Sequence, residues 1–356
     1  MLDSWEIRKY LIAFKPSNPH YKLYRRGVPK IQTLLNPYDG PIIKPRIFII
    51  SLFTPEAGIW LESDLGLYAQ NITVPGLSPL FPQVHCDEDR YVCQVTTGEG
   101  EINAATTIHA LTLYPFFDLT LTYFLIAGIA GVSPHHGTLG SVTYARYAVQ
   151  FGLEYEIDSR EKPADFFTGY VPLGAKFPTE YPQHEYGTEV FELNVALRDH
   201  AASLASGVKL TDSAKAEAFR TKFLYAPANQ PPGIIKCETA TSDTYWHGEL
   251  IAKAVEEYTK LLTNGTGNYC MAAQEDSAVL EVMVRSAARG AVDFSRIILT
   301  RSAANFDRPP PGYTAAQDLF NATSGGFPLS LANLYKVNRP FVDDVKNLSQ
   351  WRKASP

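Results

Sequence analysis

The sequence lacks an apolar run long enough to cross a membrane. A spanning helix needs about 20 mostly apolar residues, but the most apolar window, Leu119–Val132, has about 14 and contains two glycines. This window fits a strand followed by a turn better, so we expect no transmembrane segment. The chain also lacks the basic start and apolar core of a signal peptide, because it opens with Met-Leu-Asp-Ser-Trp-Glu.

An excess of positive charge is missing as well. The 32 Lys and Arg residues are outnumbered by 37 Asp and Glu residues, which gives a net charge of −5. Surfaces that bind polyanions are rich in clustered basic residues, so we expect no nucleic-acid partner. His135 and His136 are adjacent and have no third ligand at zinc spacing, so we expect no metal site.

Cysteine is rare, with only four residues in the chain. Cys86 and Cys93 are spaced so that a disulfide can close a small hairpin. Cys237 and Cys270 are either a second bridge or two buried thiols. Glycosylation sequons begin at Asn71, Asn264, Asn321 and Asn347. Together these features favour a secreted or vesicular protein over a cytoplasmic one, with a leader that was removed or that lies outside this sequence.

What the sequence does contain is an alternation of short apolar runs with helical patterns. The runs that predict buried strands lie at 46–51, 91–96, 121–127, 234 onward and 294–301. The helical patterns begin at Pro55 and also cover 102–111, 249–258 and the residues after 278. Because no separate second core is visible, the alternation predicts a single three-layer α/β/α domain with a mixed central sheet over residues 46–310.

The remaining segments are expected to surround this domain. An insertion at about 152–233 contains helical stretches near 188–204 and 211–224. Residues 1–45 form an N-terminal arm, and residues 311–356 form a C-terminal helical tail with two short helical patterns at 328–335 and 342–348.

The segment from Leu121 to Arg146 sets the expected fold. Its apolar run is followed by Gly128 and Gly131, which predicts a buried strand, a glycine turn and a second strand. Because glycine has no side chain, the backbone here can come close to a ligand. The alternative is a tight strand exit in which the glycines serve only the backbone angles.

Several motifs resemble a known superfamily. Gly128-Ile-Ala-Gly131, followed by Gly137–Val142 and Tyr144–Tyr147, is similar to the central signature of nucleoside phosphorylases and nucleosidases. Over residues 45–310 the sequence most resembles the fungal purine nucleoside permease family, most specifically in Thr97–Ala105 and Gln274–Ala278. The resemblance implies a nucleoside phosphorylase-like fold and a purine nucleoside as small-molecule partner. The residues that it places around the base are Gly128, Ile129, Ala130 and Gly131.

Cleavage of an N-glycosidic bond needs one group that activates the nucleophile, one that holds the ribose and one that steadies the departing base. The resemblance implies that Glu56 activates a water, although an acid near a helix start can also simply complement the helix dipole. It implies that Glu275 accepts hydrogen bonds from the ribose hydroxyls, and a helix-start acid is again the alternative. Gln274 stands beside it where relatives carry methionine, which makes the floor of the ribose site more polar.

Asn305 falls where relatives place a residue that faces the imidazole nitrogen of the purine. An amide both donates and accepts, which suits the 6-oxopurine bases of inosine and guanosine. Asp307 is the alternative acid if the alignment is shifted by two residues. Tyr245 and Trp246 match the position of an aromatic residue beside the base, and core packing is their alternative.

These residues predict a purine nucleoside hydrolase. The first strand is not followed by the glycine-rich loop and arginine usual in phosphorylases, and a carboxylate at Glu56 would repel phosphate. If phosphate is nevertheless a co-substrate, the candidates to bind it are Arg146, Arg301 and the turn from Gly98 to Gly100; no other cofactor is expected. A non-catalytic nucleoside-binding protein that serves uptake is the second reading, and a homo-oligomer is left open.

Overall fold

The computed structural model describes residues 40–348. Most of the expected N-terminal arm and the end of the C-terminal tail, residues 1–39 and 349–356, lie outside this range. The strands are β1 (Ile47–Ser51), β2 (Gln70–Thr73), β3 (Gln83–Cys86), β4 (Val92–Thr96), β5 (Tyr123–Val132), β6 (Val142–Tyr144), β7 (Tyr147–Gln150), β8 (Glu154–Glu156), β9 (Tyr170–Pro172), β10 (Val190–Glu192), β11 (Ile234–Lys236), β12 (Glu238–Thr241), β13 (Tyr269–Ala273) and β14 (Ile297–Phe306). The α-helices are α3 (Thr54–Leu61), α4 (Glu101–Leu113), α5 (Val195–Leu204), α6 (Ala214–Arg220), α7 (Glu249–Leu262), α8 (Asp276–Ala288), α9 (Ala315–Asn321) and α10 (Gly326–Asn347).

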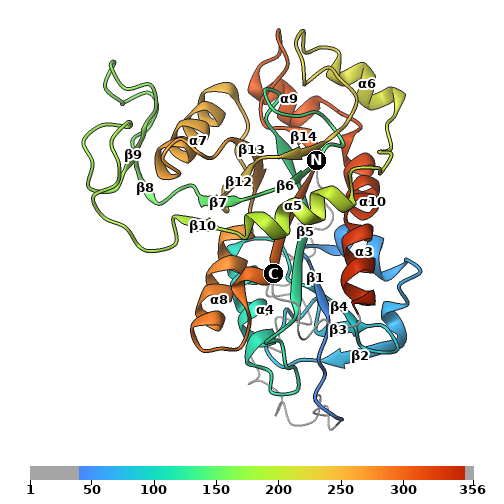
Figure 1. Cartoon of the computed structure of the whole chain (residues 1–356). Helices are drawn as coiled ribbons and strands as arrows, with labels where there is room; N and C mark the ends of the chain where they lie inside the picture. Colours follow the sequence, from blue (N-terminus) through green and yellow to red (C-terminus); the bar gives the residue numbers. More distant parts are fainter. Residues whose placement is uncertain (1–39, 349–356) are drawn as a thin grey trace, which may run out of the picture.

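A 12-stranded mixed sheet runs through the centre of the described chain (Figure 1). Its main path is β10-β7-β12-β13-β5-β1-β4-β3-β2, and β14, β6 and β11 branch from it. Strand β5 is the hub, because it pairs in parallel with β1 and β14 and in antiparallel with β13. The small pair β8-β9 stands apart as a hairpin that projects from one side of the molecule (Figure 1).

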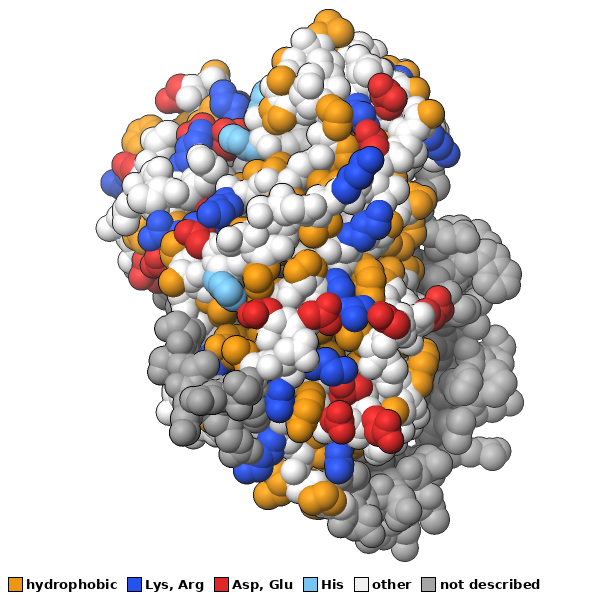
Figure 2. Space-filling view, turned by 45° about the vertical axis from the view of Figure 1, so that its right-hand side comes forward, with side chains coloured by type: hydrophobic (Ala, Val, Ile, Leu, Met, Phe, Trp, Pro, Cys, Tyr) orange, Lys and Arg blue, Asp and Glu red, His pale blue; other side chains and the backbone are white. Residues whose placement is uncertain are grey.

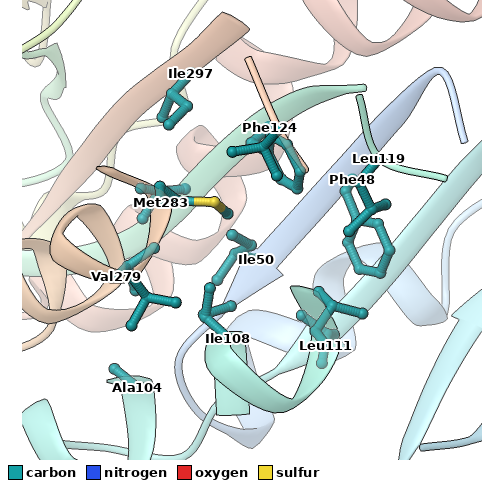
Figure 3. Packing of buried hydrophobic residues seen from close by; sticks show 14 of the residues in the cluster. Phe48, Ile50, Ala104, Ile108, Leu111, Leu119, Phe124, Val279, Met283 and Ile297 are labelled. Atoms are coloured by element: carbon teal, nitrogen blue, oxygen red, sulfur yellow. The ribbon is translucent and has the colours of Figure 1, made fainter. Parts of the chain in front are cut away.

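Helices cover both faces of the sheet, as alternation along β1 requires. Phe48 and Ile50 face the layer of α4 and α8, where the buried side chains of the two helices recur every three or four residues. Ile47 and Ile49 face the opposite layer, which is formed by α3, α5 and α10. Figure 3 shows the first layer, with Ile108 and Leu111 of α4 and Val279 and Met283 of α8 packed against Phe48, Ile50 and Phe124. The predicted three-layer α/β fold with a mixed sheet is confirmed.

Three local predictions are wrong. The turn predicted at Gly128 and Gly131 is not there, because β14 pairs with the ten-residue strand β5 from Phe124 to Val132, past both glycines; the turn follows Val132, and the second strand of the prediction is β6. Residues near 188 do not begin a helix, since β10 pairs there with β7 at the sheet edge before α5 starts. The two helical patterns of the tail are one 22-residue helix, α10, which contains Pro340.

The continuity of α10 follows from its packing. Leu334, Val337, Phe341 and Val345 recur at helical spacing and are buried in the second layer against the sheet. The C-terminal segment is therefore a part of the helical layer rather than an appendage to it.

The described chain contains two disulfides, Cys86–Cys93 and Cys237–Cys270, and no free cysteine. The first bridge joins β3 to β4 within the hairpin, as predicted. The second bridge shows that Cys237 and Cys270 form a disulfide and are not two buried thiols. The asparagines of all four sequons are exposed. Paired cysteines are compatible with a secreted or extracellular protein.

Between residues 40 and 348 no helix combines the length and the apolar character that a membrane span requires. On the face of the molecule in Figure 2, acidic and basic side chains are interspersed and form no continuous basic patch.

Candidate functional site

A cavity of about 1080 Å³ opens where the carboxyl ends of β1, β5 and β14 meet the start of α10. Such an edge of parallel strands is a common place for a ligand in α/β proteins. The sequence-predicted residues that line this cavity are Glu56, Ile129, Ala130, Gly131, Tyr245, Trp246, Gln274, Glu275, Arg301, Asn305 and Asp307. Residues far apart in the sequence are thus brought to one place.

Glu56 lies in the wall of this cavity and is 1% exposed. Helix α3 starts directly after β1, with Pro55 in its first turn where the missing N–H costs nothing. The Leu52 N–H donates to Glu56 Oε2 at 2.8 Å, and the Ile129 N–H donates to Oε1 at 2.6 Å. Burial raises the pKa of Glu56 to about 8, although Arg301 and the two N–H donors act in the opposite direction.

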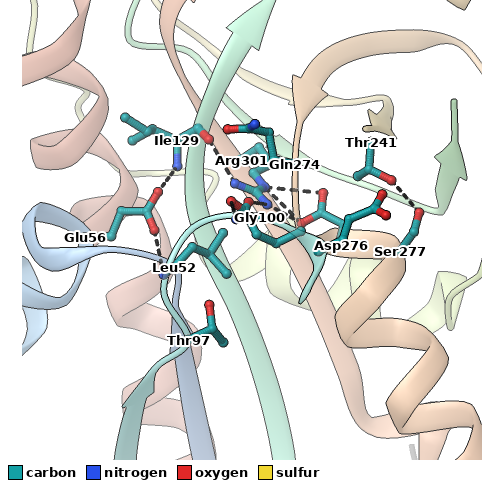
Figure 4. Close-up of polar contacts among 12 residues, drawn as sticks. Leu52, Glu56, Thr97, Gly100, Ile129, Thr241, Gln274, Asp276, Ser277 and Arg301 are labelled. Carbon is teal, nitrogen blue, oxygen red and sulfur yellow. Dashed lines mark hydrogen bonds and ion pairs between the residues drawn. The ribbon is translucent and has the colours of Figure 1, made fainter. Parts of the chain in front are cut away.

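Arg301 on β14 connects the carboxylates of the site. Its Nη2 donates to Glu275 Oε2 at 3.0 Å, and its Nε donates to Asp276 Oδ1 at 3.0 Å. Its Nη1 donates to the Ile129 carbonyl at 2.9 Å. Figure 4 shows Ile129 between Glu56 and Arg301, with its N–H toward one and its carbonyl toward the other. Every nitrogen of the guanidinium group therefore already has an acceptor in the protein.

The Glu275 carboxylate lies where the end of β13, the start of α8 and the start of α4 meet. Glu275 precedes α8, and its Oε1 accepts the N–H of Gly100 at 3.1 Å from the start of α4. Gln274 turns its Nε2 to the carbonyl of Asp243 at 3.0 Å. Glu275 is only 4% exposed, and it belongs to the wall of the cavity.

Two glycines of β5 are required by these contacts. A Cβ at Gly128 would lie 2.5 Å from Arg301 Nη1, 2.7 Å from Leu52 Cδ1 and 3.0 Å from Glu56 Oε1. A Cβ at Gly131 would lie 3.2 Å from the Asn305 amide nitrogen. The close approach expected at these glycines is therefore made by protein side chains that line the cavity.

Asn305 and Tyr245 form another part of the cavity wall. Asn305 Nδ2 donates to the Phe306 carbonyl at 2.8 Å, and its side chain is hydrogen-bonded to the Tyr245 hydroxyl. Tyr245 is 53% exposed, so its ring is open to a ligand. Trp246 is 5% exposed and packs on Phe151 with ring centroids 5.8 Å apart, which is the arrangement of a core residue.

Asp307 is engaged in the protein itself. Its Oδ2 accepts the hydroxyl of Tyr269 at 2.9 Å, and its Oδ1 accepts Arg308 Nε at 2.8 Å. Burial raises the pKa of Asp307, against the effect of Arg308. Asp307 is therefore paired directly with the guanidinium group of its neighbour Arg308 and with a buried tyrosine hydroxyl, whereas Glu56 accepts only backbone N–H groups.

The candidates for phosphate binding are dispersed. Arg146 does not line the cavity: it forms an ion pair with Glu192, and its guanidinium lies over the ring of Tyr147. A Cβ at Gly98 would lie 3.3 Å from Asn103 Cγ of α4, and Gly98 does not line the cavity. Of this set, Gly100 and Arg301 reach the carboxylate Glu275.

The histidine pair is likewise separate from the cavity. His135 stacks on Tyr225 with ring centroids 5.5 Å apart, and neither His135 nor His136 lines the cavity.

Sequence reasoning missed a part of this site. It considered Arg301 only as a phosphate contact, although an arginine in an otherwise apolar buried strand signals buried carboxylate partners. It also left out one wall of the cavity, which comes from the C-terminal segment and includes Asp318, Phe320, Phe327 and Leu329. No local pattern relates these residues to Glu56.

Comparison with known proteins gives a consistent result. A family model described as purine nucleoside permease (NUP) matches residues 44–355. A purine nucleoside permease of Candida albicans is 46% identical over 316 residues, which is 88% of this chain and 77% of the relative. A probable purine nucleoside permease of Schizosaccharomyces pombe is 41% identical over 319 residues, which is 87% of this chain and 92% of the relative.

Among solved structures, the futalosine hydrolase of Helicobacter pylori strain 26695 has a similar fold, with a TM-score of 0.51. The match covers 85% of this chain and 98% of the hydrolase, at 15% sequence identity. At this identity the likeness concerns the fold alone.

Proposed function

This chain belongs to the purine nucleoside permease family, and we propose that its cavity binds a purine nucleoside and hydrolyses the N-glycosidic bond. The fold, which is similar to that of a futalosine hydrolase, is compatible with this chemistry but does not by itself grant an activity. The proposal rests on the site.

The observation that carries it is the Glu56 carboxylate. Two backbone N–H groups fix its orientation, and the remaining lone pairs are available to a water in the cavity. A carboxyl group with a pKa of about 8 is a far stronger base than an ordinary glutamate, because burial disfavours its charge. A buried base of this kind beside a ligand-sized cavity is a mark of a catalytic site.

In the proposed reaction a water attacks C1′ of the ribose while Glu56 takes one of its protons. The bond between C1′ and N9 breaks, and its electron pair leaves with the base. The proton held by Glu56 is finally released, and the base is neutralised by a proton from solvent, so that ribose and free base are the products. Asn305 stabilises the departing base by a hydrogen bond from its amide, and Glu275 accepts from the ribose hydroxyls.

The charge of the site favours water over phosphate as the nucleophile. Glu56, Glu275 and Asp276 surround Arg301, whose nitrogens are already engaged. An excess of carboxylates stabilises the positive charge that develops on the ribose in the transition state. The same excess repels a phosphate dianion, and Arg146 lies elsewhere, paired with Glu192.

The base is proposed to be a 6-oxopurine, because Asn305 can donate to one atom of its edge and accept from another. The open ring of Tyr245 beside Asn305 offers an apolar face on which a purine can stack.

Substitution of Glu56 by Gln tests the proposal. The amide keeps the size of the side chain but cannot take a proton, so base release from inosine or guanosine is expected to fall by about 10²- to 10⁴-fold. Affinity for the nucleoside, measured by calorimetry, is expected to change little. Equal rates of base release in the variant and the native chain would rule out Glu56 as the base.

A second function is favoured by the names of the relatives, which are called permeases. The chain would then bind nucleosides for uptake without cleaving them. Tight binding of inosine that leaves the nucleoside intact over hours would support this function and exclude hydrolysis.

The proposed location is a secretory or extracellular compartment. All four cysteines are paired, and the four sequon asparagines are exposed. Detection of the glycosylated protein outside the cell would agree with this location, and exclusively cytoplasmic protein with free thiols would contradict it.

A further inference from the structure

A buried pair of polar residues lines the cavity near Tyr245. His247 lies between β12 and α7, and Asp318 lies in α9. The ring atom Nε2 of His247 is 3.0 Å from Oδ2 of Asp318, and the two side chains are 3% and 6% exposed. Both residues belong to the cavity wall.

The two side chains have more hydrogen-bonding capacity than the protein uses. Within residues 40–348, Nδ1 of His247 and Oδ1 of Asp318 find no hydrogen-bond partner, and the contact between Nε2 and Oδ2 has the distance but not the alignment of a hydrogen bond. Buried polar atoms in native proteins almost always have partners. Because both residues line a ligand-sized cavity, a bound ligand can supply the missing groups.

The pair is close to the residues that the proposed function assigns to the base. The Tyr245 hydroxyl is hydrogen-bonded to Asn305 and lies within electrostatic range of Asp318. A purine that presents its imidazole edge to Asn305 carries N1 and the C2 substituent on the far side of its six-membered ring. These atoms then need hydrogen-bond partners from a different element, and Asp318 of α9 can be one of them.

We propose that Asp318, positioned by His247, selects 6-oxopurine nucleosides by accepting a hydrogen bond from N1–H of the base. This inference deepens the proposed function and rests on it for the class of ligand. An ionised carboxylate only accepts hydrogen bonds, so it matches the N1–H of hypoxanthine and guanine and also the 2-amino group of guanine. Adenine has a lone pair at N1, which the carboxylate repels. The expected order of affinity is guanosine, inosine, adenosine.

The competing explanation is that the pair only fastens α9 to the rest of the fold. In that case, substitution of Asp318 would weaken the binding of all nucleosides alike. A recognition role changes the ratio between them, because it depends on the donor and acceptor pattern of the base.

Calorimetric titration of the full chain with guanosine, inosine and adenosine separates the two explanations. In Asp318→Asn the amide can donate to N1 of adenine, so the ratio of guanosine to adenosine affinity is expected to fall at least about tenfold. Asp344→Asn is the matched control, since Asp344 also lies 3.0 Å from a histidine, His200, but at an exposed position outside the cavity. The ratio of guanosine to adenosine affinity in Asp344→Asn is expected to stay at the native value. A ratio that Asp318→Asn leaves within twofold of the native one would overturn the inference.

A measurement on the native chain covers the case in which Asp318→Asn does not fold. Binding of 1-methylinosine, which has no N1–H, is expected to be at least about tenfold weaker than binding of inosine. Equal affinities would refute the role of Asp318. Binding of the native chain in the predicted order without any cleavage would keep this inference and reject hydrolysis, whereas the absence of any purine nucleoside binding would reject both.

Discussion

The protonation of Glu56 can be tested through the stability of the fold, without any substrate. In the folded chain the pKa of Glu56 is raised from 4.5 to about 8 by burial. Between these two pH values the folded protein holds a proton on Glu56 that the unfolded chain has lost. The stabilisation is therefore complete below about pH 4.5 and is lost as the pH rises through 8.

The size of the effect follows from linkage. Where only the folded state holds the proton, the free energy of unfolding falls by about 1.4 kcal/mol for each unit by which the pH rises. Over the full interval the shift corresponds to about 5 kcal/mol as an order of magnitude. In Glu56→Gln this contribution is absent, so the native chain should lose stability relative to the variant as the pH rises from 5 to 8.

The variant also loses one acceptor for a backbone N–H, which costs about 1–3 kcal/mol at every pH. The informative quantity is therefore the slope of the difference with pH and not its value at one pH. Urea unfolding of the native chain and Glu56→Gln at several pH values, with the disulfides intact, measures that slope. Glu62→Gln, a change at an exposed glutamate at the end of the same helix, is the control that should follow the native chain. A pH-independent difference between Glu56→Gln and the native chain would refute a raised pKa at Glu56.

Two further predictions concern activity and packing. Because a base acts only when it is deprotonated, kcat/KM for a 6-oxopurine nucleoside should rise with pH up to about 8 and then level off, whereas a rate that already levels off near pH 5 would contradict this. Gly128→Ala should destabilise the fold by about 1–3 kcal/mol and lower base release, because its Cβ would meet Arg301 and Leu52 at 2.5 and 2.7 Å and both are held in place. Gly207→Ala, with no atom within 4 Å of the added Cβ, is the control, and equal losses of stability in both variants would show that the fit at Gly128 is irrelevant.

The layered fold could be predicted because its signals are local. Strand β1 and helix α4 show in the sequence as a continuous apolar run and as a helical period, and each is buried where the pattern places it. The end of β5 was mispredicted because Gly128 and Gly131 are typical of turns as well as of tightly packed strands. Only the pairing with β14, more than 150 residues later, decides between the two.

The site was predicted in part for a similar reason. Glu56, Glu275 and Asn305 lie in segments that resemble a known superfamily, and the structure brings them to one cavity. The contacts of Arg301 and the pair of His247 with Asp318 join distant elements, so neither periodicity nor a motif reveals them.

The central claim is that water is the nucleophile, and the identity of the sugar product tests it most directly. Guanosine is incubated with the purified chain with and without phosphate, and the sugar product is identified by mass spectrometry. The account predicts free ribose, released at a rate that does not depend on phosphate. Ribose 1-phosphate as the product, or intact guanosine after prolonged incubation, would contradict it.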